Sequence, residues 1–194
     1  FIAMNLTRWG FKPAGDNGSF FQRIALRRDQ LDGAHSTAEI DGQKFSFGED
    51  FLANAVGATL TGPLVFAGSG WIVKSKNIDP YQSIDVKGKI IVVVGQGFPK
   101  GVVRADLTGV QGTDWSSPGL YAQRHGAQAI LSLPDAATAQ GWAQQLQRLM
   151  QPSRASVEKF QTTANGTPVP TVVLSATLAH ALLAGATPAA ATLI

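Results

Sequence analysis

The chain has 194 residues, of which 44% are hydrophobic and 15% charged, and its formal net charge is +3. This composition predicts a folded chain with one sizeable core and excludes a disordered one. The absence of cysteine excludes disulfide bonds, thiolate zinc sites and cysteine nucleophiles. Because the basic residues are scattered and no apolar run approaches the ~20 residues that cross a bilayer, we expect neither nucleic-acid binding nor a membrane span.

The first third of the chain predicts a helix, a strand and a hairpin. Apolar residues in 1–9 have helical spacing, and Gly10 stands where a left-handed cap would end the helix. Residues 20–26 alternate as a strand does. Residues 37–47 carry Asp41-Gly42 between two short runs, which is the signal for a tight hairpin.

From residue 56 onward the chain consists of short apolar runs separated by glycine, proline and Asn-Asp turns. Such runs are typical of strands in one sheet or barrel, and they lie at 58–60, 64–67, 71–73 and 89–94. Ser117-Pro118 is a cap and first-turn pair for a helix that runs to His125, where Gly126 closes it before a strand at 127–133.

The last third predicts two helices and two strands. Asp135 caps a helix whose apolar side chains lie on one face through residue 150. Strands at 157–162 and 169–174 are joined through Asn165-Gly166, and Ser175 caps a final helix that ends at Gly185. The sequence therefore predicts a mixed α and β fold, a β-rich sheet or flattened barrel flanked by helices, with a helix, strand and hairpin before it.

Two segments carry a resemblance to a known family. Residues 10–22 read GFKPAGDNGSFFQ and residues 64–71 read LVFAGSGW. Both resemble the bacterial zinc aminopeptidases related to glutamate carboxypeptidase and the transferrin receptor. Residues 86–94 and 121–130 are similar to the core of the protease-associated domain inserted in those enzymes. The resemblance implies a lead-in over residues 1–55, taken from the start of the peptidase domain, and a protease-associated domain over residues 56–190.

The resemblance also implies where the chemistry lies. In that family, His and carboxylate ligands, including a His-x-Asp motif, hold paired zinc ions, and a Glu acts as general base. This chain has no His-x-Asp motif and only three Glu, at 39, 49 and 158. We therefore expect no catalytic residue and no metal ligand here, with zinc bound by a peptidase domain outside the chain. The expected function is a non-catalytic module that shapes substrate access to a secreted or periplasmic zinc aminopeptidase, or that mediates protein interaction.

An alternative interpretation is that the chain is a small self-sufficient enzyme or nucleotide-binding domain. The segment Gly95 to Gly101 follows a buried strand, as a dinucleotide-binding loop does. Its third glycine is one residue late, however, and Pro99 interrupts the helix that should receive the pyrophosphate. No Gly-x-Ser-x-Gly elbow of a serine hydrolase is present.

The long segment 95–117 holds the candidate partner-binding residues. Long loops in compact domains are usually functional or disordered, and aromatic and Arg side chains anchor interfaces. Phe98, Arg104 and Trp115 are therefore the candidate contacts with the peptidase domain or with a peptide or protein partner. The competing interpretation places Trp115 in the core under the loop. The apolar residues of 1–21 predict a further contact, which could be a fold back onto the 37–47 hairpin or a dimer.

We expect none of the three histidines to bind a metal. His125 lies at the end of a predicted helix, where a cation meets the negative end of the helix dipole. His180 lies away from the apolar face of its helix, which predicts a solvated side chain. His35 has no Asp at a ligand spacing, so we expect it to lack an acidic partner.

Overall fold

A computed structural model describes residues 1–54, 57, 59–152, 154–160 and 168–184 of the chain. The chain divides into two compact units. Unit 1 comprises residues 1–29 and 153–163, and unit 2 comprises residues 30–152 and 164–194. Each unit is described by itself.

Unit 1 consists of two chain segments held together by a short antiparallel ribbon. Its elements are α1 (Ile2–Arg8), the 3-10 turn η1 (Asp16–Gly18), β1 (Leu26–Arg27), β10 (Ser156–Val157) and the turn η4 (Glu158–Phe160). Leu26 pairs with Val157 in the ribbon. The helix predicted over residues 1–9 is confirmed, with Gly10 at a φ of 78° beyond its end.

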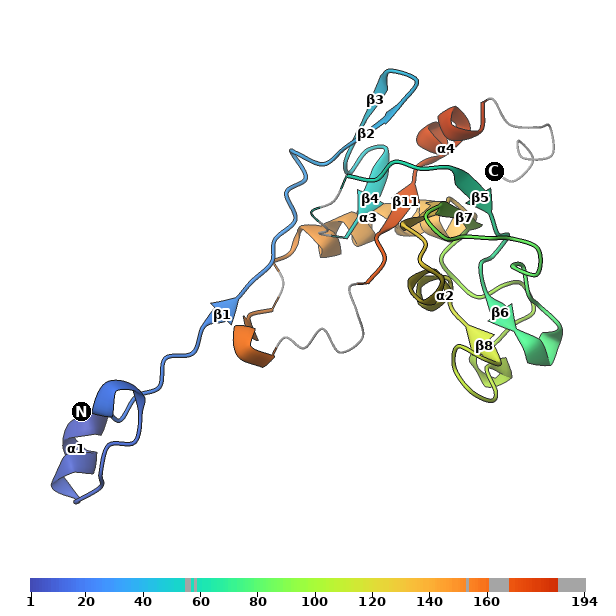
Figure 1. Ribbon diagram of the computed structural model, residues 1–194. Helices are drawn as coiled ribbons and strands as arrows, with labels where there is room; N and C mark the ends of the chain where they lie inside the picture. Colours follow the sequence, from blue (N-terminus) through green and yellow to red (C-terminus); the bar gives the residue numbers. More distant parts are fainter. Residues whose placement is uncertain (55–56, 58, 153, 161–167, 185–194) are drawn as a thin grey trace. The chain divides into compact units, whose positions relative to one another are not determined.

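Unit 2 is built on a five-stranded sheet (Figure 1). The strands lie in the order β4 (Phe51–Ala53), β11 (Thr171–Leu174), β9 (Ala129–Leu133), β7 (Ile90–Val94) and β5 (Leu64–Phe66). The last four strands are parallel to one another, and β4 is antiparallel to them. The predicted mixed α and β class is confirmed. In the described residues the sheet is open, because β4 and β5 are its two edges.

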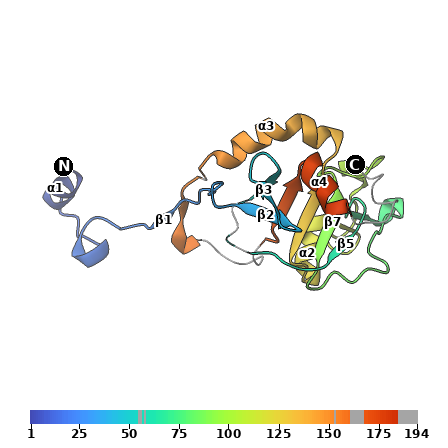
Figure 2. The same cartoon turned by 90° about the horizontal axis from the view of Figure 1, so that it is seen from above.

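Three helices accompany the sheet: α2 (Pro118–His125), α3 (Ala136–Met150), which is the long orange helix of Figure 2, and α4 (Ala176–Leu183). Each starts at the predicted cap. The side chains of Ser117, Asp135 and Ser175 accept hydrogen bonds from the backbone N–H three residues later. These bonds satisfy donors that the first turn of a helix leaves without a partner. The predicted helix starts are confirmed.

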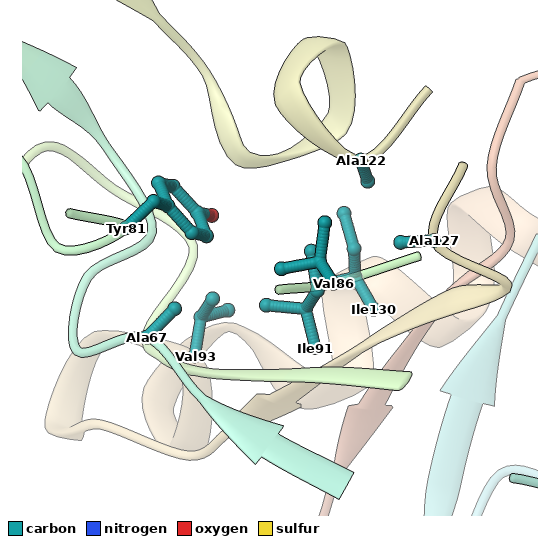
Figure 3. Close-up of a cluster of buried hydrophobic side chains, with 8 residues drawn as sticks. All are labelled: Ala67, Tyr81, Val86, Ile91, Val93, Ala122, Ala127 and Ile130. Carbon is teal, nitrogen blue, oxygen red and sulfur yellow. The ribbon is translucent and has the colours of Figure 1, made fainter. Parts of the chain in front are cut away.

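The two faces of the sheet bury separate cores. Because successive residues of a strand point to opposite faces, Ile91 and Val93 lie on one face and Val92 on the other. Figure 3 shows the first core, in which Ala122 of α2 approaches Val86 and Ile130. The second core joins the sheet to α4 and to the hairpin of β2 (Thr37–Ile40) and β3 (Gln43–Ser46). α2 and α4 therefore cover opposite faces.

The predicted hairpin is confirmed in detail. Asp41 and Gly42 have φ values of 49° and 80°, as the two central residues of a type I′ turn require. A second short ribbon pairs β6 (Ile72–Val73) with β8 (Trp115–Ser116). The turn η2 (Lys74–Lys76) directly follows β6, and an ion pair of Lys76 with Asp106 at 3.2 Å joins it to the turn η3 (Arg104–Asp106).

Several strand predictions are wrong. Of residues 20–26, only Leu26 belongs to a strand. Residues 71–73 contribute to the β6–β8 ribbon and not to the main sheet. Residues 59 and 60 form no strand, and residue 58 lies outside the described residues.

The last two described strands of the chain do not pair with each other. β10 pairs with β1 in unit 1, whereas β11 lies between β9 and β4 in unit 2. The apolar run Thr171–Leu174 suits a buried parallel position, so burial overrides pairing with the nearest strand in sequence. Residues 161–162 and Asn165-Gly166 lie outside the described residues.

The division into units differs from the expected boundary at residue 55. The hairpin and β4 belong to unit 2, because β4 pairs with β11 and the side chains of Phe45 and Phe51 are buried in its core. A boundary after residue 55 would remove an edge strand and two core aromatics. The described helices include none that is long and apolar enough to cross a bilayer.

Tyr81 joins the loop before β7 to the turn after β5, and it supports a stability prediction. Its hydroxyl donates a hydrogen bond of 3.0 Å to the carbonyl oxygen of Gly70, and its ring stacks on Tyr121 with centroids 3.7 Å apart. Tyr81→Phe should lower the free energy of unfolding by about 1–2 kcal/mol, since a buried carbonyl loses its partner. Chemical denaturation measures this. The hydroxyl of Tyr121 makes no hydrogen bond among the described residues. Tyr121→Phe is therefore the matched control and should change the free energy of unfolding little.

Tyr81→Phe should also change how the stability of the fold depends on pH. Burial raises the pKa of Tyr81 well above its ordinary value of 10.0. The unfolded chain releases this proton near pH 10 while the folded chain retains it, so stability is lost as the pH rises above about 10. Tyr81→Phe should lose less stability than the unmodified chain between pH 9 and pH 11. An equal loss in both proteins would contradict the assignment.

Candidate functional site

Two hollows lie along the sheet of unit 2, beside the carboxyl end of β7. The first has a volume of about 220 Å³ and the second about 150 Å³. Both are lined by Gln96, which follows β7, and by Thr171, the first residue of β11. These two hollows, here called the paired hollows, are the candidate binding site of unit 2.

The lining of the paired hollows is neutral. The first hollow has an apolar floor that includes Val93 and Ile130, with Trp71 also in its lining. Its polar groups are the side chains of Ser69, Gln96, Ser117, Ser132 and Thr171. The second adds Asn54 and Gln145, with Leu149 and Val173 as apolar lining. Neither hollow is lined by an acidic or basic side chain.

A contact between Gly95 and Asp135 fixes the geometry beside the first hollow. The Asp135 carboxylate accepts hydrogen bonds of 2.7 Å from the N–H and from the hydroxyl of Thr138, and the hydroxyl bond in particular lowers the pKa of Asp135. Gly95 has a φ of 69°, and a Cβ at this position would overlap the same carboxylate. The Gly95 N–H donates to Leu133 O at 2.9 Å, and the hydroxyl of Ser132 donates to Gly95 O at 2.8 Å.

A pair of primary amides borders both hollows. The side chains of Gln96 and Gln145 exchange two hydrogen bonds, each 3.2 Å long. Both distances are at the long end of the range for N–H···O bonds. Gln145 comes from α3, which the Asp135 cap starts, and Gln96 follows Gly95 directly. The Asp135 contact thus positions both partners of the amide pair.

The predicted partner-binding residues lie on three different pieces of the 95–117 segment. Phe98 lies in the turn after β7 and is 41% exposed, Arg104 is exposed in η3, and Trp115 is half-buried in β8. The ring contact of Phe98 is with Trp71, at a centroid distance of 4.8 Å, and with neither of the other two residues. The segment is ordered by the β6–β8 ribbon and by η3.

Trp71 is the residue that sequence reasoning missed. Its indole N–H donates to Gly97 O at 3.0 Å, so it fixes the start of the segment and also lines the first hollow. Its place directly after the Gly68-Ser69-Gly70 turn, in a motif that the family resemblance already singled out, was the available signal.

The Gly95 to Gly101 segment does not have the geometry of a dinucleotide-binding loop. Such a loop opens directly into a helix whose N-terminus meets the pyrophosphate. Here the next α-helix starts at Pro118, and the carboxylate of Asp135 lies against Gly95, where it would repel a phosphate. The volume of the first hollow is also below the ~300–1,000 Å³ of most cofactor and drug sites.

The histidine predictions have mixed outcomes. His125 Nδ1 lies 2.9 Å from Tyr121 O and its ring stacks on Tyr121, which confirms its role at the end of α2. His180 is exposed, as predicted. The prediction for His35 is wrong, because its Nδ1 lies 2.7 Å from Oδ2 of Asp32 on the exposed turn before β2. Among the described residues, no group of three or more His, Cys, Asp or Glu side chains is placed to hold a metal ion.

Unit 1 exposes many large apolar side chains, which are here together called the unit 1 surface. Its members are Phe1, Ile2, Met4, Trp9, Phe11, Phe21, Ile24 and Leu26, each more than half exposed. α1 has no buried residue. Unit 1 also carries seven basic residues and three acidic ones, a net charge of +4, whereas unit 2 carries nine and ten, a net charge of −1. The positive charge of the chain therefore belongs to unit 1.

Comparisons with models of known protein families, with curated proteins and with solved structures find no match to this chain.

Gly95 supports a prediction with a close internal control. Gly95→Ala should lower the free energy of unfolding by about 1–3 kcal/mol, because the new methyl group must displace the Asp135 carboxylate and because a positive φ strains a residue with a Cβ. Gly97→Ala, two residues further on, meets nothing within 4 Å and should change stability by much less. Thermal or denaturant unfolding measures both variants. Equal effects would show that the contact does not constrain this turn.

Proposed function

We propose that the chain is a non-catalytic, protease-associated module of a zinc aminopeptidase, which docks onto the peptidase domain through the unit 1 surface. In this role the module shapes the entrance to the active site, and the zinc belongs to the peptidase domain. A secreted or periplasmic parent enzyme is part of the same proposal. The motifs at residues 10–22 and 64–71, which resemble that enzyme family, motivate the choice of partner.

The unit 1 surface is the observation that carries the proposal. Contiguous apolar patches beyond a few hundred Å² are uncommon on soluble monomers and usually mark contact sites. The aromatic side chains of Trp9, Phe11 and Phe21 are of the kind that dominate binding energy at interfaces. The net charge of +4 on unit 1 favours a partner with acidic groups.

The 95–117 segment supplies a second contact in this proposal. Phe98 is held on Trp71 and remains 41% exposed, so it can enter a partner without losing its support. Arg104 is exposed in η3, close in sequence to Asp106, which pairs with Lys76. Trp115, half-buried in the β6–β8 ribbon, is the third proposed contact of this segment.

A binding experiment tests the docking role. The chain should bind a purified catalytic domain of a bacterial zinc aminopeptidase of the resembled family from which the inserted domain has been deleted. Trp9→Ala and Phe21→Ala should each weaken binding by about tenfold or more, as expected for interface anchors. Because unit 1 is basic, raising the salt concentration should also weaken binding. Isothermal titration calorimetry measures both effects.

Phe66→Ala is the matched control. Phe66 is also an exposed aromatic, 42% exposed, but it lies on the edge strand β5 of unit 2. Its removal should leave the affinity unchanged. The docking role would be contradicted by an absence of binding, or by losses that are equal for Phe66→Ala and the two unit 1 variants.

The non-catalytic part of the proposal has its own test. The purified chain, freed of metal and then supplied with zinc, should retain no stoichiometric zinc and should not hydrolyse aminoacyl p-nitroanilides. A catalytic zinc ion needs about three protein ligands with an open position. Metal analysis and a chromogenic assay measure the two outcomes. Stoichiometric zinc together with activity that a chelator abolishes would contradict it.

A further inference from the structure

The amide pair of Gln96 and Gln145 lies where the paired hollows meet. Gln96 lines both hollows, and Gln145 lines the second. Thr171, the first residue of β11, also lines both hollows. Because the two hollows share Gln96 and Thr171, they adjoin, and they are here together called the groove.

The chemistry of the groove selects an uncharged ligand. No acidic or basic side chain lines either hollow, so a charged group placed there would lose hydration without gaining a counter-charge. The N-terminal end of α2 adds few free donors. Pro118 has no N–H. Ser117 accepts the N–H of Leu120 through its hydroxyl and the N–H of Tyr121 through its carbonyl oxygen.

We propose that the paired hollows bind an extended, uncharged peptide segment, with one backbone amide of the segment lying between Gln96 and Gln145. A primary amide has an acceptor oxygen and two N–H donors, and a peptide group has one of each. One peptide group can therefore donate its N–H to one glutamine and accept from the other. The two mutual bonds of 3.2 Å are replaced by two bonds to the ligand.

The shape of the groove agrees with this ligand. Successive side chains of an extended chain point to opposite sides, so two side chains that are two residues apart point the same way and can enter the two hollows. Volumes of about 220 and 150 Å³ are large enough for short apolar or hydroxyl side chains. The indole of Trp71, held by Gly97 O, closes one part of the first hollow with an aromatic wall. The inference concerns unit 2 alone and does not depend on docking through unit 1.

Nuclear magnetic resonance of the full chain labelled with ¹⁵N tests the inference. The probe is N-acetyl-tetra-alanine amide, which is uncharged and blocked at both ends. Titration to millimolar concentration should shift the side-chain amide resonances of Gln96 and Gln145 in a saturable way. Gln145→Ala should weaken the affinity by about tenfold, because one partner of the bound amide is lost.

Two controls make the result decisive. Gln144→Ala removes an exposed amide from the neighbouring position of α3, and this variant should bind the probe as the unmodified chain does. Maltotriose, a neutral ligand rich in hydroxyl groups but without amides, should leave the two resonances in place. The inference would be overturned if the probe shifts neither resonance, if maltotriose shifts them as strongly, or if Gln144→Ala and Gln145→Ala have equal effects. Calorimetric unfolding of each variant separates a loss of the site from a loss of the fold.

Discussion

The contact of the Asp135 carboxylate with Gly95 is the constraint on which the binding face of unit 2 depends. The carboxylate caps α3 through Thr138, and the backbone of Gly95 is held by Leu133 and Ser132 of the neighbouring strand. A side chain at position 95 would push the cap away. The Asp135 carboxylate thus sets where α3 begins and how closely the end of β7 approaches this helix. Gln145 lies on α3 and Gln96 follows Gly95, so the same contact positions both members of the amide pair.

The two units give the chain two kinds of surface. Unit 1 is basic and exposes aromatic side chains, which is suited to a partner with a complementary apolar patch. Unit 2 is nearly neutral and offers a small groove lined by hydroxyl and amide groups. In the proposed role, the first surface binds the enzyme and the second holds an extended chain, and these tasks require separate surfaces because their chemistries differ.

Local signals in the sequence predicted local structure well. The caps at Ser117, Asp135 and Ser175 and the Asp41-Gly42 turn depend on bonds within a few residues, so one sequence sufficed to find them. Pairings across long stretches of chain could not be found in this way. β11 pairs with β9 and β4 and not with β10, which is nearer in sequence, and the Gln96–Gln145 pair spans 49 residues. Trp71 likewise acquires its role only when Gly97 and Phe98 are brought to it by the fold.

The β1–β10 ribbon has a consequence for the order of folding. Arg27 and Ser156, which face each other in the ribbon, are 129 residues apart in the chain, and most of unit 2 lies between them. Closing so long a flexible loop costs conformational entropy, and the two residue pairs of the ribbon contribute little stabilising free energy against this cost. Once the strands of unit 2 have paired, however, the two ends of residues 30–152 are already confined. Unit 2 should therefore form first, and the ribbon should close afterwards as a late and easily reversed step. A growing polypeptide would complete unit 1 only after most of the chain had been made.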